Sequence, residues 1–523
     1  MKKKSKDLFL EQLIQDVHED FEKRQKERKP FEAQWKLNNN FYNGEQYISV
    51  NKLQDLEEIG KMYYWQHREV FNHISPIIDS RLSKLCLTRP EMEVLPASSD
   101  EDDKKVAKLS QNILRNVYEK LSLDKVINKA THWSEICGTS FYKISWNACG
   151  GKVVYDKEGK KVFEGEVEIC ALSPFEIYPD SPYRENVEEC ESIIQAKLYS
   201  TQEIKRIWGV DVKAQELSMS FFGSKFSEKV DNSALVIERY EAPTKDFPDG
   251  RLVCVCADSL LFDGPLPFVN LADGKRGFPF VRQTAVSSVG SFWGTSVIEK
   301  LIPIQRAYNA VKNRKHELIN RLSMGVMIVE DGSVDVEDLE QNGLEPGKII
   351  VYKQGANAPK FLSEISLPQA FSEEEESLIK EFSNISGVTD ILTNEFSSKN
   401  LSGSAIELLL ESDSTKIQTS IDEIKIAIKN VAKMILRLYK QFAVMPRLLR
   451  AGKNNENVVY WKNSDLALDD IEFLPDSTAT SSLSSKREAA LKLLSSGALK
   501  DENGRISDEV RSKILELFGI SNL

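Results

Sequence analysis

The residues that could carry out chemistry in this chain do not form a catalytic pattern. Five histidines occur in 523 residues, with no H-E-x-x-H motif and no helical i,i+4 pair among them. The segment GLEPGKII (343–350) lacks the spacing of a phosphate-binding loop and continues into β-branched residues, which predicts a turn. Acidic runs such as NVEECE and SEEEES are typical of solvated surfaces. We therefore expect no catalytic residue, metal ion or cofactor.

The seven cysteines are scattered along the chain, and none forms a C-x-x-C pair. Cys254 and Cys256 alternate on an apparent strand and should point to the same face. This pattern is typical of small core residues in a reducing compartment, not of a metal site.

Length and composition indicate a folded protein with more than one core. A chain of 523 residues exceeds the usual size of one domain, and 41% apolar and 28% charged residues are ordinary values. The beginning of the chain lacks the unbroken apolar core of a signal peptide, and no later stretch approaches 18 apolar residues, so we expect no membrane-spanning segment. The net charge of −11 argues against a broad nucleic-acid grip, but is compatible with nucleic acid sliding past.

Helical spacing over residues 305–322 predicts a helix with two unlike sides. Gln305, Asn309, Asn313, His316 and Asn320 make one side rich in amides, which an ordinary surface helix with alternating Glu and Lys would not be. A plain surface helix remains the alternative. The opposite side is apolar and interrupted by Lys315; it consists of Leu301, Ile304, Tyr308, Val311, Leu318 and Leu322.

The first half of the chain predicts mixed helix and strand. Periodicity predicts one helix through Phe21 and a second after Pro30 that ends at Gly44. Further helices are expected near residues 68–87 and 113–121. Alternating β-branched and aromatic residues predict strands in TSFYKISW, GKVVYD, EGEVEICALSPFEIYPD and, over 231–285, in ALVIERYEAP, GRLVCVCA and FPFVRQTAV.

The second half predicts long helices around a small β-rich insert. A helix from Pro368 to about Ser386 follows the insert, and a polar segment of about 17 residues then leads to Ser404-Ala405-Ile406-Glu407, which has the form of a capping box. Isoleucines and other apolar residues at alternating spacings of 4 and 3 over 417–442 predict a long helix packed against other helices, in its own chain or a neighbouring one. Two helical pieces are expected around 484–496 and 506–518.

The order of several short motifs resembles tailed-bacteriophage portal proteins over roughly residues 30 to 520. The motifs are Arg68-x-x-x-Asn72-x-Ile74-x-Pro76-Ile77-Ile78, Arg89-Pro90 with Val94 and Pro96, Gly138-Thr139-Ser140-Phe141, Ser173-Pro174-Phe175-Glu176-Ile177, Gly294-Thr295-Ser296 leading into Leu301-x-x-x-Gln305-x-x-x-Asn309, and Pro346-Gly347 in the insert.

The resemblance implies an α+β portal fold assembled as a ring, usually of twelve subunits, at one capsid vertex. It implies a division of the chain into a wing (1–290, completed by the long helix within 404–480), a first stem helix (291–323), a clip (324–367), a second stem helix (368–386), a tunnel loop (387–403) and a crown (481–523). The implied partners are the major capsid protein, the terminase large subunit, head-completion or tail adaptor proteins, and double-stranded DNA in the channel, with no membrane. The implied location is the virion, after synthesis in the host bacterial cytoplasm.

Within this resemblance, the amide-rich side of the 305–322 helix is expected to border the DNA channel, and the apolar side is expected to pack on a neighbouring subunit. A ring of twelve copies would carry a formal charge of about −132, which suits weak contact with sliding DNA. The basic candidates have inter-subunit ion pairing as an alternative role. The channel candidates are Asn309, Lys312, Asn313, Arg314, Lys315, Asn320, Arg321 and Lys399.

Two other classes of protein compete with the portal hypothesis. A nucleic-acid packaging ATPase or nuclease associated with the capsid is disfavoured because no phosphate loop, Mg²⁺-binding acidic constellation or basic cleft is visible in the sequence. A host scaffold protein that uses the 417–442 stripe as a coiled coil is disfavoured because that stripe spans only about four heptads within a mixed α and β sequence.

Overall fold

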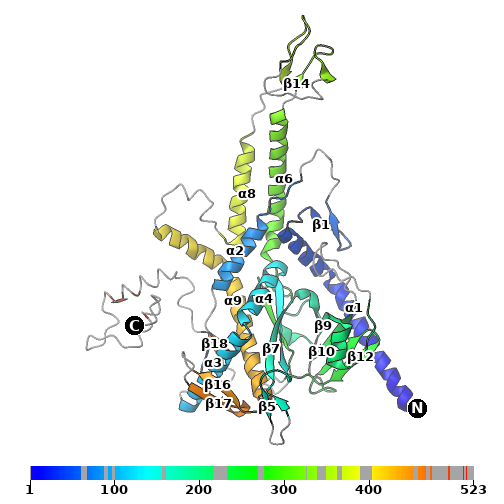
Figure 1. The fold of residues 1–523 in the computed structure, drawn as a ribbon, viewed down its shortest axis with the longest axis vertical. Coiled ribbons are helices and arrows are strands. Elements are labelled where there is room, and N and C mark those ends of the chain that lie inside the picture. The colour runs from blue at the N-terminus through cyan, green and yellow to red at the C-terminus, as the bar shows by residue number, and fades with distance from the viewer. Residues whose placement is uncertain are drawn as a thin grey trace.

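A computed structural model shows an elongated chain with a mixed α/β body, a stem of two helices and a small tip (Figure 1). The residues that the structure describes are 2–59, 68–87, 92–96, 100–155, 161–215, 232–268, 276–324, 327–337, 349–361, 368–388, 403–451, 457–466 and 471–473, with isolated positions beyond them. The predicted α+β class is confirmed.

The chain begins with one helix, α1 (Lys2–Asn43), and not with the two that the sequence predicted. Pro30 lies inside it, although proline removes a backbone donor and crowds the preceding turn. Both halves of α1 are held by tertiary contacts: Leu13, Val17 and Phe21 pack on the body sheet, and Trp35 and Phe41 lie in the central core. These contacts outweigh the local cost of the proline.

Two buried arginines fasten the middle of α1 to the body. Arg28 donates from Nη1 to the carbonyl oxygens of Phe175 and Ile177 at 2.8 and 2.9 Å, and from Nη2 to the hydroxyl of Tyr178 at 2.7 Å. Arg24 reaches the carbonyl oxygens of Tyr178 and Ser192. The motif Ser173–Ile177 is therefore held against α1 by a guanidinium that satisfies its free carbonyls.

Two antiparallel sheets form the body. The larger has the strand order β12-β11-β10-β9-β8, and the smaller has the order β13-β4-β7. The predicted strands of the first half are confirmed, except that EGEVEICALSPFEIYPD is divided into two strands by a 3-10 turn at Pro174–Glu176. The larger sheet comprises β8 (Ile177–Pro179), β9 (Ser192–Ser200), β10 (Ser233–Glu241), β11 (Arg251–Cys256) and β12 (Ser259–Gly264), and the smaller comprises β4 (Thr139–Asn147), β7 (Glu166–Leu172) and β13 (Phe280–Thr284).

Shorter elements complete the body. The helices are α2 (Ile74–Leu87), α3 (Glu101–Lys120), α4 (Leu123–Cys137) and α5 (Thr201–Trp208). The short strand pairs are β1 (Ile48–Val50) with β2 (Leu56–Glu58), β5 (Val153–Tyr155) with β6 (Lys161–Phe163), β3 (Met92–Val94) with β18 (Ile471–Phe473), and β16 (Arg447–Ala451) with β17 (Asn457–Trp461).

The long helix α9 (Gly403–Phe442) confirms the predicted helix but corrects its predicted partner. Its stripe from Ile417 to Leu438 is buried in one core with Tyr142 and Ile144 of β4 and Val281 of β13, as well as with α3. The stripe therefore covers a sheet as much as it packs on helices, because a sheet face and a helix face can both bury such a row.

The stem consists of α6 (Val297–Met324) and α8 (Ala370–Ser386), which lie side by side and rise from the body (Figure 1). At its tip, β14 (Met327–Ile328) pairs with β15 (Lys360–Phe361). The sequence predicted a helix at each of these places, and both helices are confirmed. The predicted tunnel loop after residue 388, and nearly all of the expected crown, lie outside the described residues.

The prediction that all the cysteines are core residues is only partly right. Cys137, Cys190, Cys254 and Cys256 are buried free thiols, whereas Cys149 and Cys170 are exposed, as their positions at a turn and on an outer strand face allow.

Candidate channel and assembly site

The amide side of α6 is buried against an extended segment of the same chain, residues 69–73. Gln305 Oε1 accepts from the N–H of His73 at 3.0 Å, Asn309 Oδ1 accepts from the N–H of Phe71 at 3.1 Å, and Asn313 Oδ1 accepts from the N–H of Glu69 at 3.1 Å. Gln305 Nε2 and Asn313 Nδ2 donate back to the carbonyl oxygens of Phe71 and Glu69. We call these contacts the amide ladder.

The ladder follows from matching repeats. Helix residues four apart rise about 6 Å, and strand residues two apart rise about 6.6 Å, so amides at 305, 309 and 313 meet every second residue of an antiparallel extended segment. A carboxamide both donates and accepts, as does each peptide unit that it faces. Spacing of the amides at i, i+4 and i+8 was the sequence signal for this arrangement.

For Gln305, Asn309 and Asn313, the ladder corrects the prediction that the amide side borders the channel. Asn309 is 3% exposed and Asn313 is 7% exposed within a single subunit, so neither side chain lies on a surface that DNA can reach. His316, on the same side, packs edge-on against Phe71 with ring centroids 5.3 Å apart.

The apolar side of α6 is buried against α8, which corrects the prediction that it packs on a neighbouring subunit. Leu301, Ile304 and Tyr308 belong to the same core as Leu378 and Phe382 of α8. Val311 packs at the edge of this core, Leu318 is half-buried, and the side chain of Leu322 lies outside the described residues. The apolar stripe that the sequence assigned to contact between subunits therefore pairs α6 with α8 within one chain.

Two predicted channel lysines instead form an ion pair within the stem. Lys312 and Lys315 of α6 both reach Glu375 of α8, with Nζ to carboxylate distances of 2.5 and 2.8 Å. Burial alone would raise the pKa of Glu375, but the hydrogen bonds and charges of the two lysines prevail and lower it to about 2. The acidic beginning of α8 is thus bound to α6 through Glu375.

His73 lies next to this ion pair, at the end of the ladder. Burial, and then the positive charge of Lys312, lower the pKa of His73 below its usual value. A neutral imidazole suits its packing edge-on against Tyr308, with ring centroids 4.5 Å apart.

One face of α6 remains exposed once the other two are covered. It carries Pro303, Ala307, Ala310 and Arg314, which recur at helical spacing along the stem. Of the predicted channel residues, Arg314 and Asn320 are exposed, the side chain of Arg321 lies outside the described residues, and Lys399 does too.

Arg81 joins the base of the stem to the body, and sequence reasoning missed it. Its guanidinium pairs with Glu135 of α4 at 2.8 Å, and the two side chains are 3% and 1% exposed. Nη1 donates to the carbonyl oxygen of Ser386 at the end of α8 at 2.6 Å, and Nη2 donates to Ser420 of α9. Arg81 lies four residues after Ile77, in a helix whose sequence otherwise gave no signal of a junction.

The two Gly-Thr-Ser motifs meet in space. The N–H of Gly294 donates to Thr139 Oγ1 at 2.8 Å, and a Cβ atom on Gly138, whose φ is +84°, would overlap the carbonyl of Gly294. The first motif opens β4 and the second precedes α6, so this backbone contact sets where the stem leaves the body.

No described helix is long and apolar enough to span a membrane. No curated protein matches the chain at a significant level. The family described as Phage P22-like portal protein matches residues 18–246 and 250–463. These ranges contain the ladder, the stem, the Arg81 junction and both Gly-Thr-Ser motifs. The chain belongs to the P22-like portal protein family of tailed bacteriophages, a family of structural head-to-tail connectors in which a twelve-subunit ring is typical.

Proposed function

We propose that this chain forms a ring at one capsid vertex and that double-stranded DNA enters and leaves the head through the ring's channel. The observation that carries the proposal is the family match over the stem and the body, combined with a helical stem that projects from the body and ends in a small β-containing tip. In this proposal residues 1–290 are the wing, 324–367 the clip, 387–403 the tunnel loop and 481–523 the crown. The clip would dock the terminase large subunit and later a tail adaptor, and the wing would contact the major capsid protein.

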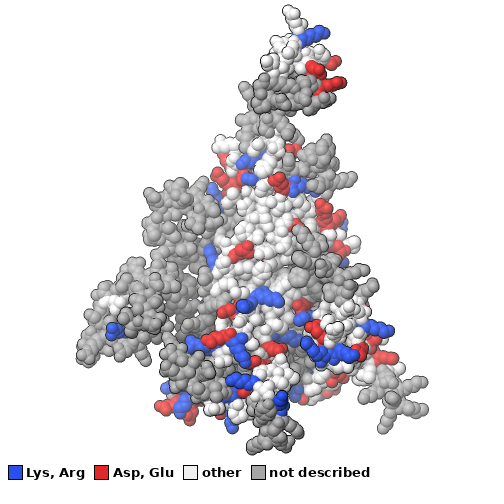
Figure 2. Space-filling view, viewed as in Figure 1, with Lys and Arg blue, Asp and Glu red and all other residues white. Residues whose placement is uncertain are grey.

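The exposed face of α6 is the part of the stem that we assign to the channel or to the neighbouring stem. Pro303, Ala307 and Ala310 offer little to hold a phosphate backbone, and the exposed cations Lys300 and Arg314 lie at the two ends of this row. In Figure 2 the lower part of the stem, where it meets the body, carries few charged side chains, and basic and acidic residues are interspersed over the upper stem and the lower body. Such a surface supports weak, non-specific contact, which sliding DNA requires.

Native mass spectrometry with negative-stain imaging of the purified protein tests the proposal. We expect a closed ring of about twelve copies with a hole wide enough for duplex DNA. A monomer that hydrolyses ATP or cleaves DNA would refute the portal role and support a packaging enzyme.

A further inference from the structure

The second stem helix and the long helix meet where the stem joins the body. α8 ends at Ser386, and α9 passes the same place at Lys416. A Cβ atom on Gly387 would lie 2.9 Å from the Cβ atom of Lys416, so the two backbones approach closely there. In Figure 1 the first turns of α9 project sideways from this point, and the rest of the helix descends along the body. We call residues 403–415 the α9 arm.

A buried hydrogen-bond network holds this meeting point. Arg81 Nη1 donates to the carbonyl oxygen of Ser386 at 2.6 Å, and Nη2 donates to Ser420 Oγ at 3.3 Å. Ser420 Oγ donates in turn to the carbonyl oxygen of Ala285, the residue after β13, at 2.8 Å. The carboxylate of Glu135 on α4 accepts from Arg81 Nε at 2.8 Å. The network ties α8 and α9 to the body, and we call it the stem joint.

The stem joint also receives the first stem helix. The hydroxyl of Ser296, just before α6, donates to the carbonyl oxygen of Glu135. The N–H of Ala285 donates to the carbonyl oxygen of Gly138, at the end of α4, at 3.0 Å. Both stem helices and α9 are therefore attached to the last turn of α4. All the side chains that take part are at most 3% exposed, so water does not compete for these hydrogen bonds.

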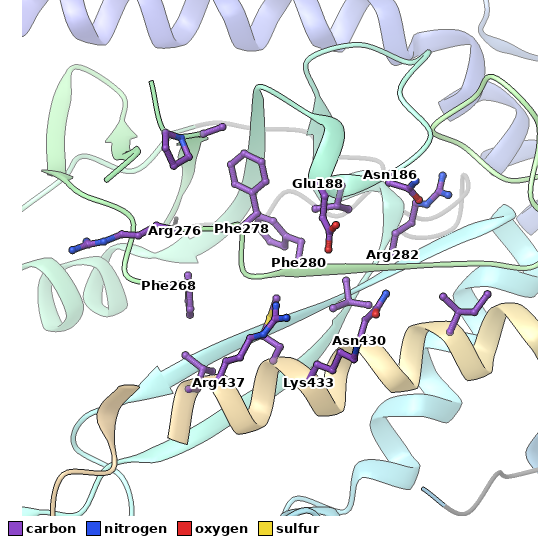
Figure 3. Close-up of a pocket in the computed structure, with 18 of the residues that line it drawn as sticks. Asn186, Glu188, Phe268, Arg276, Phe278, Phe280, Arg282, Asn430, Lys433 and Arg437 are labelled. Carbon is purple, nitrogen blue, oxygen red and sulfur yellow. The ribbon is translucent and has the colours of Figure 1, made fainter. Parts of the chain in front are cut away.

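Beyond the joint, one side of α9 is separated from the body by a cleft of about 950 Å³. Figure 3 shows Lys433 of α9 across this cleft from Phe280. On this side α9 is held at one end of the cleft by Gln441, whose Nε2 donates to the carbonyl oxygen of Pro267 at 2.9 Å. At the other end it is held by Glu423, which accepts from the hydroxyl of Thr284 at 2.7 Å, and by the stem joint. The joint is therefore the last of these attachments before the α9 arm.

We propose that Arg81 is a positioning residue, which fixes the angle between α8 and the α9 arm and thereby the place at which the chain between them enters the channel. The inference rests on the ring proposed above. A buried ion pair is weak evidence for stability, because the desolvation of two charges offsets their attraction. The planar fork of an arginine, with five N–H donors, instead holds a carboxylate, a helix-end carbonyl and a hydroxyl in fixed directions.

The length of the α9 arm makes a small change at the joint large at the far end of the arm. From Lys416 back to Gly403 the helix is about 20 Å long, at 1.5 Å per residue. A rotation of about 10° at the joint moves Gly403 by about 3 Å over this length. In a ring, the same movement in opposite subunits changes the free diameter of the channel by about twice as much.

A double substitution separates position from stability. Arg81→Met with Glu135→Leu removes both charges together, and apolar side chains in place of a buried ion pair often leave stability unchanged or raise it. The links from the guanidinium to α8 and α9 are lost. The control is Lys143→Met with Glu238→Leu, which removes another buried ion pair, 2.6 Å long, between the two body sheets. We expect the double variant at the joint to unfold at the same denaturant concentration as the parent and to form the same rings.

Two spin labels in one subunit measure the angle. Glu373→Cys on α8 and Glu407→Cys on the α9 arm carry the labels. The cysteines that are not buried are replaced by serine: Cys86, Cys149 and Cys170. Labelled subunits are diluted into unlabelled ones, so that each distance lies within one chain. We expect the double variant at the joint to broaden the distance distribution at least about twofold, because the arm is a long lever, and the control to leave it unchanged. Phage heads with the double variant should retain less DNA than heads with the control.

A second variant decides the question if the double variant does not fold. Ser420→Ala leaves the ion pair of Arg81 and Glu135 in place and removes the hydroxyl through which the joint holds α9. It should broaden the same distance distribution. Thr419→Ala, at the preceding and exposed position of α9, should leave the distribution unchanged.

Each outcome has a separate meaning. A broader distance distribution with unchanged unfolding and reduced DNA retention supports the inference. An unchanged distribution in the double variant, or in Ser420→Ala if the double variant does not fold, overturns it and leaves the ring standing. A broader distribution in heads that retain their DNA normally overturns the role of Arg81 in the channel. A parent protein that forms no ring overturns the proposed function, and the label distance within the single subunit then still shows whether Arg81 sets the angle.

Discussion

The substitution Asn309→Ala tests whether the side-chain amide of Asn309 holds the fold together or faces DNA. Asn309 Oδ1 accepts from the N–H of Phe71 at 3.1 Å, and Nδ2 donates to Gln46 Oε1 at 2.6 Å. Alanine leaves both of these buried groups without this partner, and each unsatisfied group costs about 1–2 kcal/mol. We therefore expect the extended segment to open more easily by about 2–4 kcal/mol, which is about a 30- to 900-fold increase in the opening equilibrium.

Hydrogen exchange is the appropriate assay, because a chain of this size need not unfold in one step. The amide protons of Glu69, Phe71 and His73 should exchange faster in Asn309→Ala by the factor above. The matched control is Asn384→Ala, an exposed amide on α8 of the same stem, and it should change none of them. Unchanged exchange at Phe71, together with altered DNA packaging, would refute the ladder and restore a channel-facing role for Asn309.

Four further predictions follow from the stem and its base. The pKa of Glu375 in the folded chain is lowered to about 2, so its ion pairs stabilise the stem above the usual carboxyl pKa and are lost as the pH falls toward 2. Glu375→Gln should therefore weaken the contact of α8 with α6 at pH 7 but not near pH 2. Hydrogen exchange of α8 measures this difference. Arg81→Ala leaves a buried carboxylate unpaired and should destabilise the body by about 3–5 kcal/mol in denaturant unfolding, and a loss under about 1 kcal/mol would contradict the junction. Gly138→Ala should abolish soluble protein, whereas Gly277→Ala, with open space around it, should express normally; equal yields would argue against the close backbone contact. Arg314→Glu should leave ring assembly intact and reduce packaged DNA per head, and unchanged genome content would remove Arg314 from the channel.

Local pattern predicted most of the elements because each depends on residues close in sequence. Alternation identified the strands of both sheets, and helical periodicity identified the stem helices and α9. The same reasoning failed at Pro30, where it predicted a break. The continuity of α1 depends on Arg24 and Arg28, whose carbonyl partners lie about 150 residues away in sequence, and no local rule includes such contacts.

The sequence by itself determined that residues 305–322 form a helix with an amide side and an apolar side, since the spacing of residue types is a local property. It also determined the family through the order of short motifs. Only the tertiary structure decided what each side contacts. The amides bind a segment more than 230 residues earlier in the chain, and the apolar side binds a helix about 70 residues later, so surfaces that suggested a channel and a neighbour are filled within one subunit. Which surface of the helix stays exposed depends on which segments, distant in sequence, pack on its other surfaces. Sequence periodicity contains no information about those contacts.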